Sequence, residues 1–425
     1  MLTIILFVLG LIFLFRRKYT PLLTIIIVLS STFLQLQIVE GPMVKISGYN
    51  TYDFGLLLYL LLFFQVALRN GCRFKGKVQQ IVTLFLLFLI LNGVFDIIYN
   101  ETSIGDVIIY LKNWLLITIV YIHPYINIEY TIKSLKHIYN ITLILCIFIS
   151  ICMLLKFDTG ILWYIEGRGI KPPPDCMWFS VLAFSNIWGK SKNRAIIDAF
   201  IFILPAILSL KMTYAITIAL VFTFYIILNK NVAITSKVGL SILMFFSISF
   251  TLIVSSDFSE RLSSVAAETN DISRDEQSGN FSYRILHAQE RLEFIMNDPV
   301  MSIRGFGYLH EKSLKKVLFV YGTNHGQQQL DTGDIAWSLF FIRLGFLGIF
   351  LYLIMYFTIV KTYYINRNIK ICLIFSSMLI SYLIFTSLGN CIITYSYFFI
   401  YPILFLNITN KDHQHSIPKK YSNLI

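Results

Sequence analysis

Apolar runs of about 20 residues recur along most of this chain and limit the folds open to it. A helix of that length crosses a hydrocarbon core of about 30 Å and satisfies its own backbone hydrogen bonds there. Charged residues make up only 14% of the 425 residues, whereas soluble domains carry about 25%. The mean hydropathy of +0.71 is correspondingly high. The sequence therefore predicts an all-α, polytopic integral membrane protein.

We expect about 12 or 13 transmembrane helices and one long extracytoplasmic loop. The expected spans lie at residues 2–15, 20–39, 52–68, 81–98, 107–122, 138–155, 175–189, 195–210, 212–228, 238–254, 335–360, 371–388 and 390–407. They divide the chain into an N-terminal transmembrane bundle (1–254), a long loop with an amphipathic helix (255–334), and C-terminal helices with a cytoplasmic tail (335–425).

The basic residues predict the orientation of the chain in the membrane. About 20 of the 35 Lys and Arg residues fall in alternate loops and the tail, and the opposite short loops carry few. The positive-inside rule places those basic segments in the cytoplasm and the loop 255–334 on the outer face. Topology thus explains most of the +12 net charge, so we do not expect nucleic-acid binding. The six cysteines form no CxxC pair or other metal-ligand spacing.

An arginine-bearing helix is expected inside the long loop. Apolar residues recur at helical spacing from Phe281, and the helix should end at Asp298-Pro299 because the residue before proline leaves the helical region. Arg284, His287 and Arg291, at i, i+3 and i+7, fall on one face. Arginine pairs in bidentate fashion with phosphate oxygens and stays charged, so this face could bind a lipid diphosphate. The alternative is an ordinary interfacial helix on the outer surface.

Other basic residues are candidates for the same chemistry. Arg304 precedes a Gly-x-Gly turn that allows close backbone approach, although such a turn alone is weak evidence. Lys211 lies at a break between two spans and Arg343 inside a span, where a charge normally faces a cavity or a partner. Arg168 lies in an outer loop between aromatic residues and three prolines, where rings could stack on sugars. An interfacial aromatic belt explains that loop equally simply.

Three motifs resemble those of the bacterial O-antigen polymerase and O-antigen ligase families (Wzy and WaaL). The family has about 10 to 14 transmembrane helices and a long periplasmic loop between two late ones. The matching segments are Ser209-Leu210-Lys211, Tyr283-Arg284 through Pro299 with Arg304-Gly305-Phe306-Gly307, and Asp334 before Gly345-Phe346-Leu347-Gly348. Specific residues match only between about 205 and 350, while the topology matches over the whole chain.

This resemblance implies a metal-independent, inverting glycosyltransferase of the GT-C type in the bacterial inner membrane, with no cofactor. Its donor would be an undecaprenyl-diphosphate-linked oligosaccharide, and a chain-length regulator protein would be a partner besides the membrane lipids. Arg284, and with less complete matching Lys211, would grip the diphosphate as it leaves. From their own positions in the sequence, Arg291, Arg304, Arg343 and Arg168 are candidates for further substrate contacts.

The residue at position 334 separates the members of this group. Ligases carry a histidine where Asp334 aligns, and that histidine is proposed to activate the acceptor. Asp334 could act as the base here, or simply favour the start of the next helix; His325 is a second candidate. The departure favours a polysaccharide polymerase joining lipid-linked repeat units. A ligase acting on another acceptor, or a lipid-linked oligosaccharide flippase, stays open.

Overall fold

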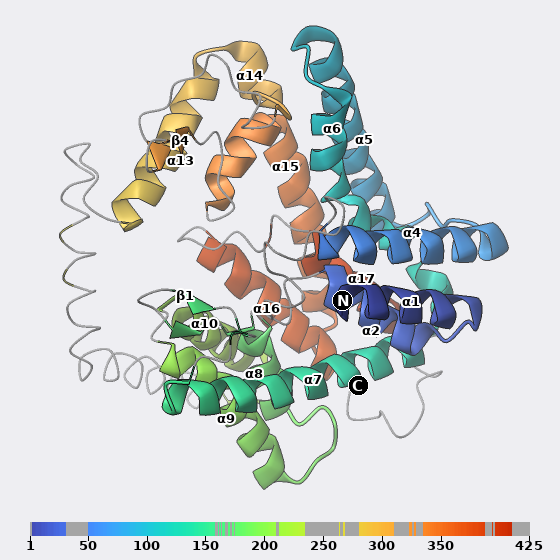
Figure 1. Ribbon diagram of the computed structural model, residues 1–425, viewed down its shortest axis with the longest axis vertical. Coiled ribbons are helices and arrows are strands. Elements are labelled where there is room, and N and C mark those ends of the chain that lie inside the picture. The colour runs from blue at the N-terminus through green and yellow to red at the C-terminus, as the bar shows by residue number, and fades with distance from the viewer. Residues whose placement is uncertain are drawn as a thin grey trace.

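The computed structural model describes most of the chain and shows a mainly helical protein (Figure 1). The described residues are 2–30, 50–157, 160, 162, 164–165, 169–170, 172–173, 175–209, 212–233, 263, 267, 280–309, 323–324, 327–328, 335–386, 393 and 396–409. Strands in this part of the chain are limited to two antiparallel pairs of two residues each.

The N-terminal half is built of helices joined by short turns. They are α1 (Leu2–Phe15), α2 (Tyr19–Ser30), α4 (Thr51–Asn70), α5 (Lys77–Tyr99), α6 (Ile104–Lys112), the 3₁₀ helices η2 (Leu115–Tyr121) and η3 (His123–Tyr125), and α7 (Ile128–Leu154). A hairpin of β1 (Tyr164–Ile165) and β2 (Gly169–Ile170) precedes α8 (Cys176–Phe184), α9 (Lys192–Leu208) and α10 (Met212–Leu228).

The C-terminal half begins with the helices of the long loop. They are α13 (Asn280–Met296) and α14 (Pro299–Arg304), followed by a hairpin of β3 (Thr323–Asn324) and β4 (Gln327–Gln328). The last elements are α15 (Ala336–Ile365), α16 (Lys370–Thr386), η7 (Ser396–Phe399), α17 (Ile400–Leu404) and η8 (Phe405–Thr409).

Several helices are long and apolar enough to span a membrane. Among the described residues they are α4, α5, α7 and α15, and α6 with η2 makes a fifth if that pair is one span with a 54° bend. The apolar helices α1, α2 and α16, and the Ile216–Leu228 part of α10, are shorter. The predicted class, an all-helical chain with several helices able to cross a membrane, is therefore confirmed, while the number of spans and their orientation stay predictions.

Three expected spans are not single continuous helices. The range 107–122 breaks between α6 and η2, and 175–189 contains only the nine-residue α8. In 390–407, the described residues form the short helices η7, α17 and η8. Hydropathy shows only that a segment is apolar. It does not show where a helix breaks, because a break depends on local partners for the backbone groups that it exposes. The range 238–254 lies outside the described residues.

Local partners support the break between α6 and η2. The carbonyl oxygen of Lys112 accepts a hydrogen bond from the Tyr52 hydroxyl at 3.0 Å, and the carbonyl of Asn113 accepts one from Ser396. Trp114 packs at the bend, with its ring 5.1 Å from Phe85 on α5. The freed carbonyls thus have donors, and a buried ring fills the corner of the bend.

Elements pack on both ends of the pair α15 and α16, and α1, α2 and α4 pack with one another beside them (Figure 1). One group contains α7, α8, α9 and α10, with α10 packed against α16. At the other end, α13 and α14 pack against α15, and α15 packs in turn against α5. The two described helices of the long loop, α13 and α14, therefore pack against the helical bundle through α15.

Candidate functional site

Helix α13 carries the predicted arginine face and lies against α15 (Figure 1). It ends at Met296, and α14 begins at Pro299, as the proline predicted. The Asp298 side chain caps α14, because its Oδ1 accepts the Val300 and Met301 amides at 2.7 and 3.0 Å. The predicted helix and its end are thus confirmed.

The arginine face is turned toward the protein, which differs from the expected helix lying on lipid headgroups. His287 and Arg291 are fully buried, and Arg284 is partly exposed. His287 Nδ1 lies 2.7 Å from Ser338 Oγ on α15, and the Arg291 guanidinium lies 3.1 Å from the Glu290 carboxylate. A buried guanidinium needs such partners because its desolvation is costly. The face therefore lines an internal boundary with α15, and Arg284 is its partly accessible member.

Arg304 ties the end of α14 to α5. Its Nη1 donates to Asp96 Oδ1 at 2.6 Å and to Asn92 Oδ1 at 2.8 Å. The side chain of Arg304 is 12% exposed and that of Asp96 is fully buried. The guanidinium also lies 4.0 Å from the centre of the Phe95 ring, within cation–π range. Arg304 is thus engaged with α5 in this structure.

The Asp96 carboxylate also fixes the backbone beyond Arg304. Its Oδ2 accepts the amide of Tyr308 at 2.6 Å, and Oδ1 accepts from Asn100 Nδ2 at 2.9 Å. Asn92 returns a bond from Nδ2 to the carbonyl of Arg304 at 3.0 Å. Residues 92 and 96 are spaced by four and share one face of α5, and Asn100, the next residue at that spacing, caps the end of the helix. That face is a polar strip that binds the Gly-x-Gly turn.

The other side of the Gly-x-Gly turn packs against a break in α15. Gly345 has a φ of 58° inside α15, so the helical hydrogen bonds around it are interrupted. The carbonyl of Ile342 instead accepts the amides of Phe306 and Gly307 at 2.7 and 3.3 Å. Arg343 Nη1 donates to the carbonyls of Gly307 and Leu309 at 2.9 and 2.5 Å. Arg343 thus has backbone carbonyls as partners. Its position in an apolar span predicted either a partner or a cavity.

Two glycines permit the close approach of the turn and α15. Gly305 has a φ of 82°, and a Cβ on it would lie 2.7 Å from the carbonyl oxygen of Ile342. A Cβ on Gly345 would lie 2.3 Å from the amide nitrogen of Gly305. Both positions need glycine for their backbone angle as well as for space. The sequence suggested that the Gly-x-Gly turn approaches a ligand, and the structure shows that it approaches α5 and α15.

Alanine at Gly307 is expected to loosen this junction. Gly307 has a φ of 108°, and its new Cβ would lie 2.1 Å from Asp96 Oδ2. Strain and the displaced carboxylate together should lower the free energy of unfolding by about 1–3 kcal/mol. Fluorescence-detected thermal unfolding in detergent measures the loss. Gly160→Ala is the matched control, because Gly160 also has a positive φ but no atom near its added Cβ. Equal losses in both variants would contradict a specific contact with Asp96.

The structure brings together four of the eight candidate residues. Arg284, Arg291, Arg304 and Arg343 lie on the contacting elements α13, α14 and α15. Their roles as substrate contacts stay predictions. The other four candidates lie outside the described residues: Lys211, Arg168, His325 and Asp334.

Sequence reasoning missed the polar residues that hold the turn. Asn92 and Asp96 lie within an expected span, where a carboxylate is rare and marks a functional or structural site. Their spacing of four, which puts both polar side chains on one face of an apolar span, is the signal that points to them. The ion pair of Lys112, in the expected span 107–122, was missed as well: its Nζ lies 2.8 Å from Asp53 Oδ1.

Arg284 is the partly exposed guanidinium of the arginine face, and a guanidinium suits an anionic substrate. Within the described ranges, no group of three or more His, Cys, Asp or Glu residues is placed to hold a metal ion. In comparisons with known proteins, neither a family model nor a curated protein matches this chain.

Proposed function

We propose that this protein is a polysaccharide polymerase of the O-antigen type, which joins oligosaccharide repeat units carried on undecaprenyl diphosphate. The observation that carries the proposal is the packing of the arginine face of α13 onto α15, beside the Arg304 turn. This packing gathers Arg284, Arg291, Arg304 and Arg343 on adjoining elements of the predicted outer side. A guanidinium group suits a diphosphate leaving group, and Arg284 is partly exposed.

The four arginines divide into two roles in this proposal. Arg284 is partly exposed and contacts the diphosphate, while Arg291 lies deeper on the same face. Arg304 and Arg343 are bound to Asp96 and to backbone carbonyls, so they act as positioning residues that fix α14 and the turn. Rigid support of this kind holds charges where they are needed before the reaction starts.

The proposed reaction transfers a glycan between two lipid carriers. A hydroxyl oxygen of the acceptor sugar attacks the anomeric carbon of the donor from the face opposite the diphosphate. The bond from that carbon to the diphosphate oxygen breaks, so the configuration inverts and the lipid diphosphate departs as an anion. The hydroxyl proton passes to a base, for which Asp334 and His325 are the candidates. Lys211 is proposed as a further cation at the diphosphate. Its ammonium group is a single point charge, unlike the planar guanidinium of arginine, which can donate two parallel hydrogen bonds.

A reconstitution experiment tests this function against transport. The purified protein is placed in liposomes with lipid-linked repeat units, and the products are separated by size. We expect a ladder of glycans that grows by whole units, with release of one lipid diphosphate for each linkage. Movement of the lipid across the bilayer without elongation would replace the proposal with a flippase. Transfer of a single unit to a different acceptor would indicate a ligase.

A further inference from the structure

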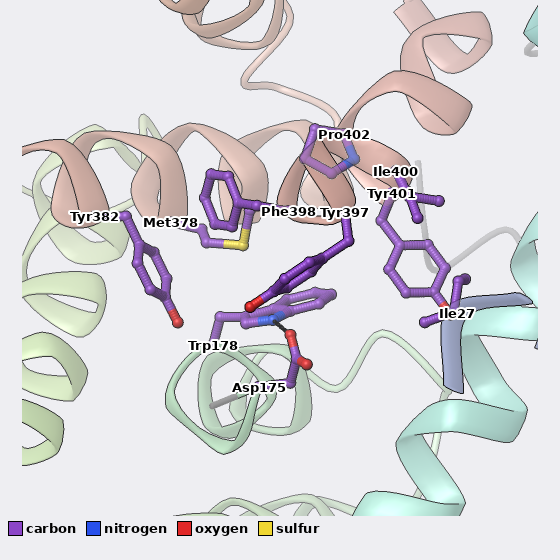
Figure 2. Close-up of a pocket in the computed structure, with 10 residues that line it drawn as sticks. All are labelled: Ile27, Asp175, Trp178, Met378, Tyr382, Tyr397, Phe398, Ile400, Tyr401 and Pro402. Atoms are coloured by element: carbon purple, nitrogen blue, oxygen red, sulfur yellow. Dashed lines mark hydrogen bonds between the residues drawn. The ribbon is translucent and has the colours of Figure 1, made fainter. Parts of the chain in front are cut away.

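A small pocket lies between α8, α16 and the C-terminal short helices (Figure 2). Its volume is about 30 Å³, which is enough for about one or two water-sized groups. Most of its wall is apolar or aromatic, and Asp175 supplies the carboxylate. The lining residues are Ile27, Asp175, Trp178, Met378, Tyr382, Tyr397, Phe398, Ile400, Tyr401 and Pro402.

The Asp175 carboxylate is fixed by one neighbour and has no cationic partner in the described chain. Its Oδ1 accepts a hydrogen bond from Trp178 Nε1 at 2.6 Å. None of the ion pairs among the described residues includes Asp175. The hydroxyl ends of Tyr382 and Tyr397 are directed toward the side of the pocket that holds Asp175 and Trp178 (Figure 2). A negative charge thus stands among aromatic rings, which carry negative electrostatic potential on their faces.

We propose that this pocket binds a primary ammonium group. A carboxylate beside Trp and Tyr rings provides charge pairing together with cation–π attraction, whereas a neutral hydroxyl gains from neither. The small volume admits an ammonium end but excludes a whole sugar ring, so the group must project from a larger ligand. Two sources offer it, an amino sugar of the glycan or the ethanolamine headgroup of a membrane lipid. Binding of the group itself does not depend on the proposed polymerase function.

The protonation of Asp175 gives the site a pH signature. Asp175 directly precedes α8, a nine-residue helix that is too short to cross a membrane by itself. Burial raises the pKa of this carboxyl to about 6, although the bond from Trp178 opposes the rise. The described titratable groups around it are Cys176, Tyr214, Tyr382, Tyr397 and Tyr401, thiol and phenol groups whose ordinary pKa values lie above about 8. Among these described groups, the carboxyl of Asp175 is therefore the one that we expect to change charge between pH 5 and 8.

The test measures binding of three probes to the purified full-length chain in a non-ionic detergent. Saturation-transfer NMR titrations compare glucosamine, N-acetylglucosamine and ethanolamine at pH 7. We expect the two amines to bind and to compete with each other, and N-acetylglucosamine to bind at least about tenfold more weakly because its nitrogen carries no charge. Tighter binding of glucosamine identifies a glycan ligand, and tighter binding of ethanolamine identifies a lipid headgroup. Equal binding of glucosamine and N-acetylglucosamine, or binding of none of the probes, would overturn the proposal.

Two further measurements test whether binding of the amine depends on Asp175. Asp175→Asn should weaken amine binding at least about tenfold, whereas Asp106→Asn in the first turn of α6 should leave it unchanged. With ethanolamine, whose ammonium stays charged, the wild-type affinity should fall about tenfold from pH 7.5 to pH 5 as the carboxylate is protonated. A wild-type affinity in Asp175→Asn, or a flat pH profile, would contradict the assignment.

The asparagine variant is expected to fold. The fold raises the pKa of Asp175 from 3.8 to about 6, so it disfavours the charged carboxylate. The free energy of unfolding therefore falls as the pH rises through about 6, where the carboxyl loses its proton. Asparagine removes the charge and keeps an acceptor for Trp178. The unfolding midpoint of Asp175→Asn at pH 7.5 should therefore equal or exceed that of the wild type, and a loss of binding then reports on the site.

Discussion

Alanine at Arg284 is expected to abolish glycan elongation while the protein stays inserted and abundant in the membrane. Arg284 is the partly exposed arginine of the α13 face, so its proposed contact is with the lipid diphosphate. Removing one preorganised donor to a developing anion slows such reactions about 100- to 1,000-fold. Membrane extracts should contain single lipid-linked units and no ladder, and the rate of elongation in liposomes gives the magnitude.

Two comparison variants make this result specific. Arg284→Lys keeps the charge but loses the planar fork, so it should retain part of the activity. Arg367→Ala removes an arginine from the predicted cytoplasmic side beyond α15, where it lies over Tyr364, and should leave the rate unchanged. A normal ladder from Arg284→Ala would exclude Arg284 from the site. Equal losses in Arg284→Ala and Arg367→Ala would indicate a general effect on the protein.

The largest effect on stability is expected from alanine at Asp96. This change leaves the Arg304 guanidinium without its carboxylate and deprives the amide of Tyr308 of its acceptor. Breaking a buried ion pair from one side costs about 3–5 kcal/mol. We expect a marked fall in the thermal unfolding midpoint in detergent, and protease sensitivity near the Gly-x-Gly turn.

A double-mutant cycle separates the ion pair from simple loss of packing. Asp96→Ala with Arg304→Ala should be less damaging than the sum of the two single changes, because neither charge is then left unpaired. Asp53→Ala is the matched comparison, since its pair with Lys112 is partly exposed and should contribute no more than about 1 kcal/mol. Additive losses at Asp96 and Arg304, or a larger loss at Asp53, would contradict the role of this pair.

The helix at residues 280–296 shows what periodicity can predict. Its apolar spacing and the Asp298-Pro299 stop are local signals, and both its extent and the shared face of Arg284, His287 and Arg291 agree with them. What covers part of that face was not predicted, because Ser338, the partner of His287, lies on another helix, 51 residues further along the chain. Periodicity groups side chains on a face but does not identify the surface that covers them.

The polar strip on α5 shows a different limit. A carboxylate in an apolar span was visible at Asp96, but its arginine lies 208 residues further along the chain. Which basic residue pairs with it depends on the break in α15 that admits the turn. The sequence showed Gly345 as one end of a Gly-x-x-Gly motif and not as a break, because a positive φ is a property of the folded backbone. His325 and Asp334 lie outside the described residues, so their roles stay predictions.

The Arg304–Asp96 pair also sets an order of events during synthesis. A ribosome adding about 5–20 residues per second completes Arg304 about 10–40 s after Asp96. Through that interval α5 is already made, while the guanidinium that compensates its carboxylate does not yet exist. Gly345 and the carbonyl of Ile342 follow later still. Closure of the turn between α5 and α15 is therefore a late assembly step, and a chain that ends before Arg304 contains α5 without the partner of its buried charge.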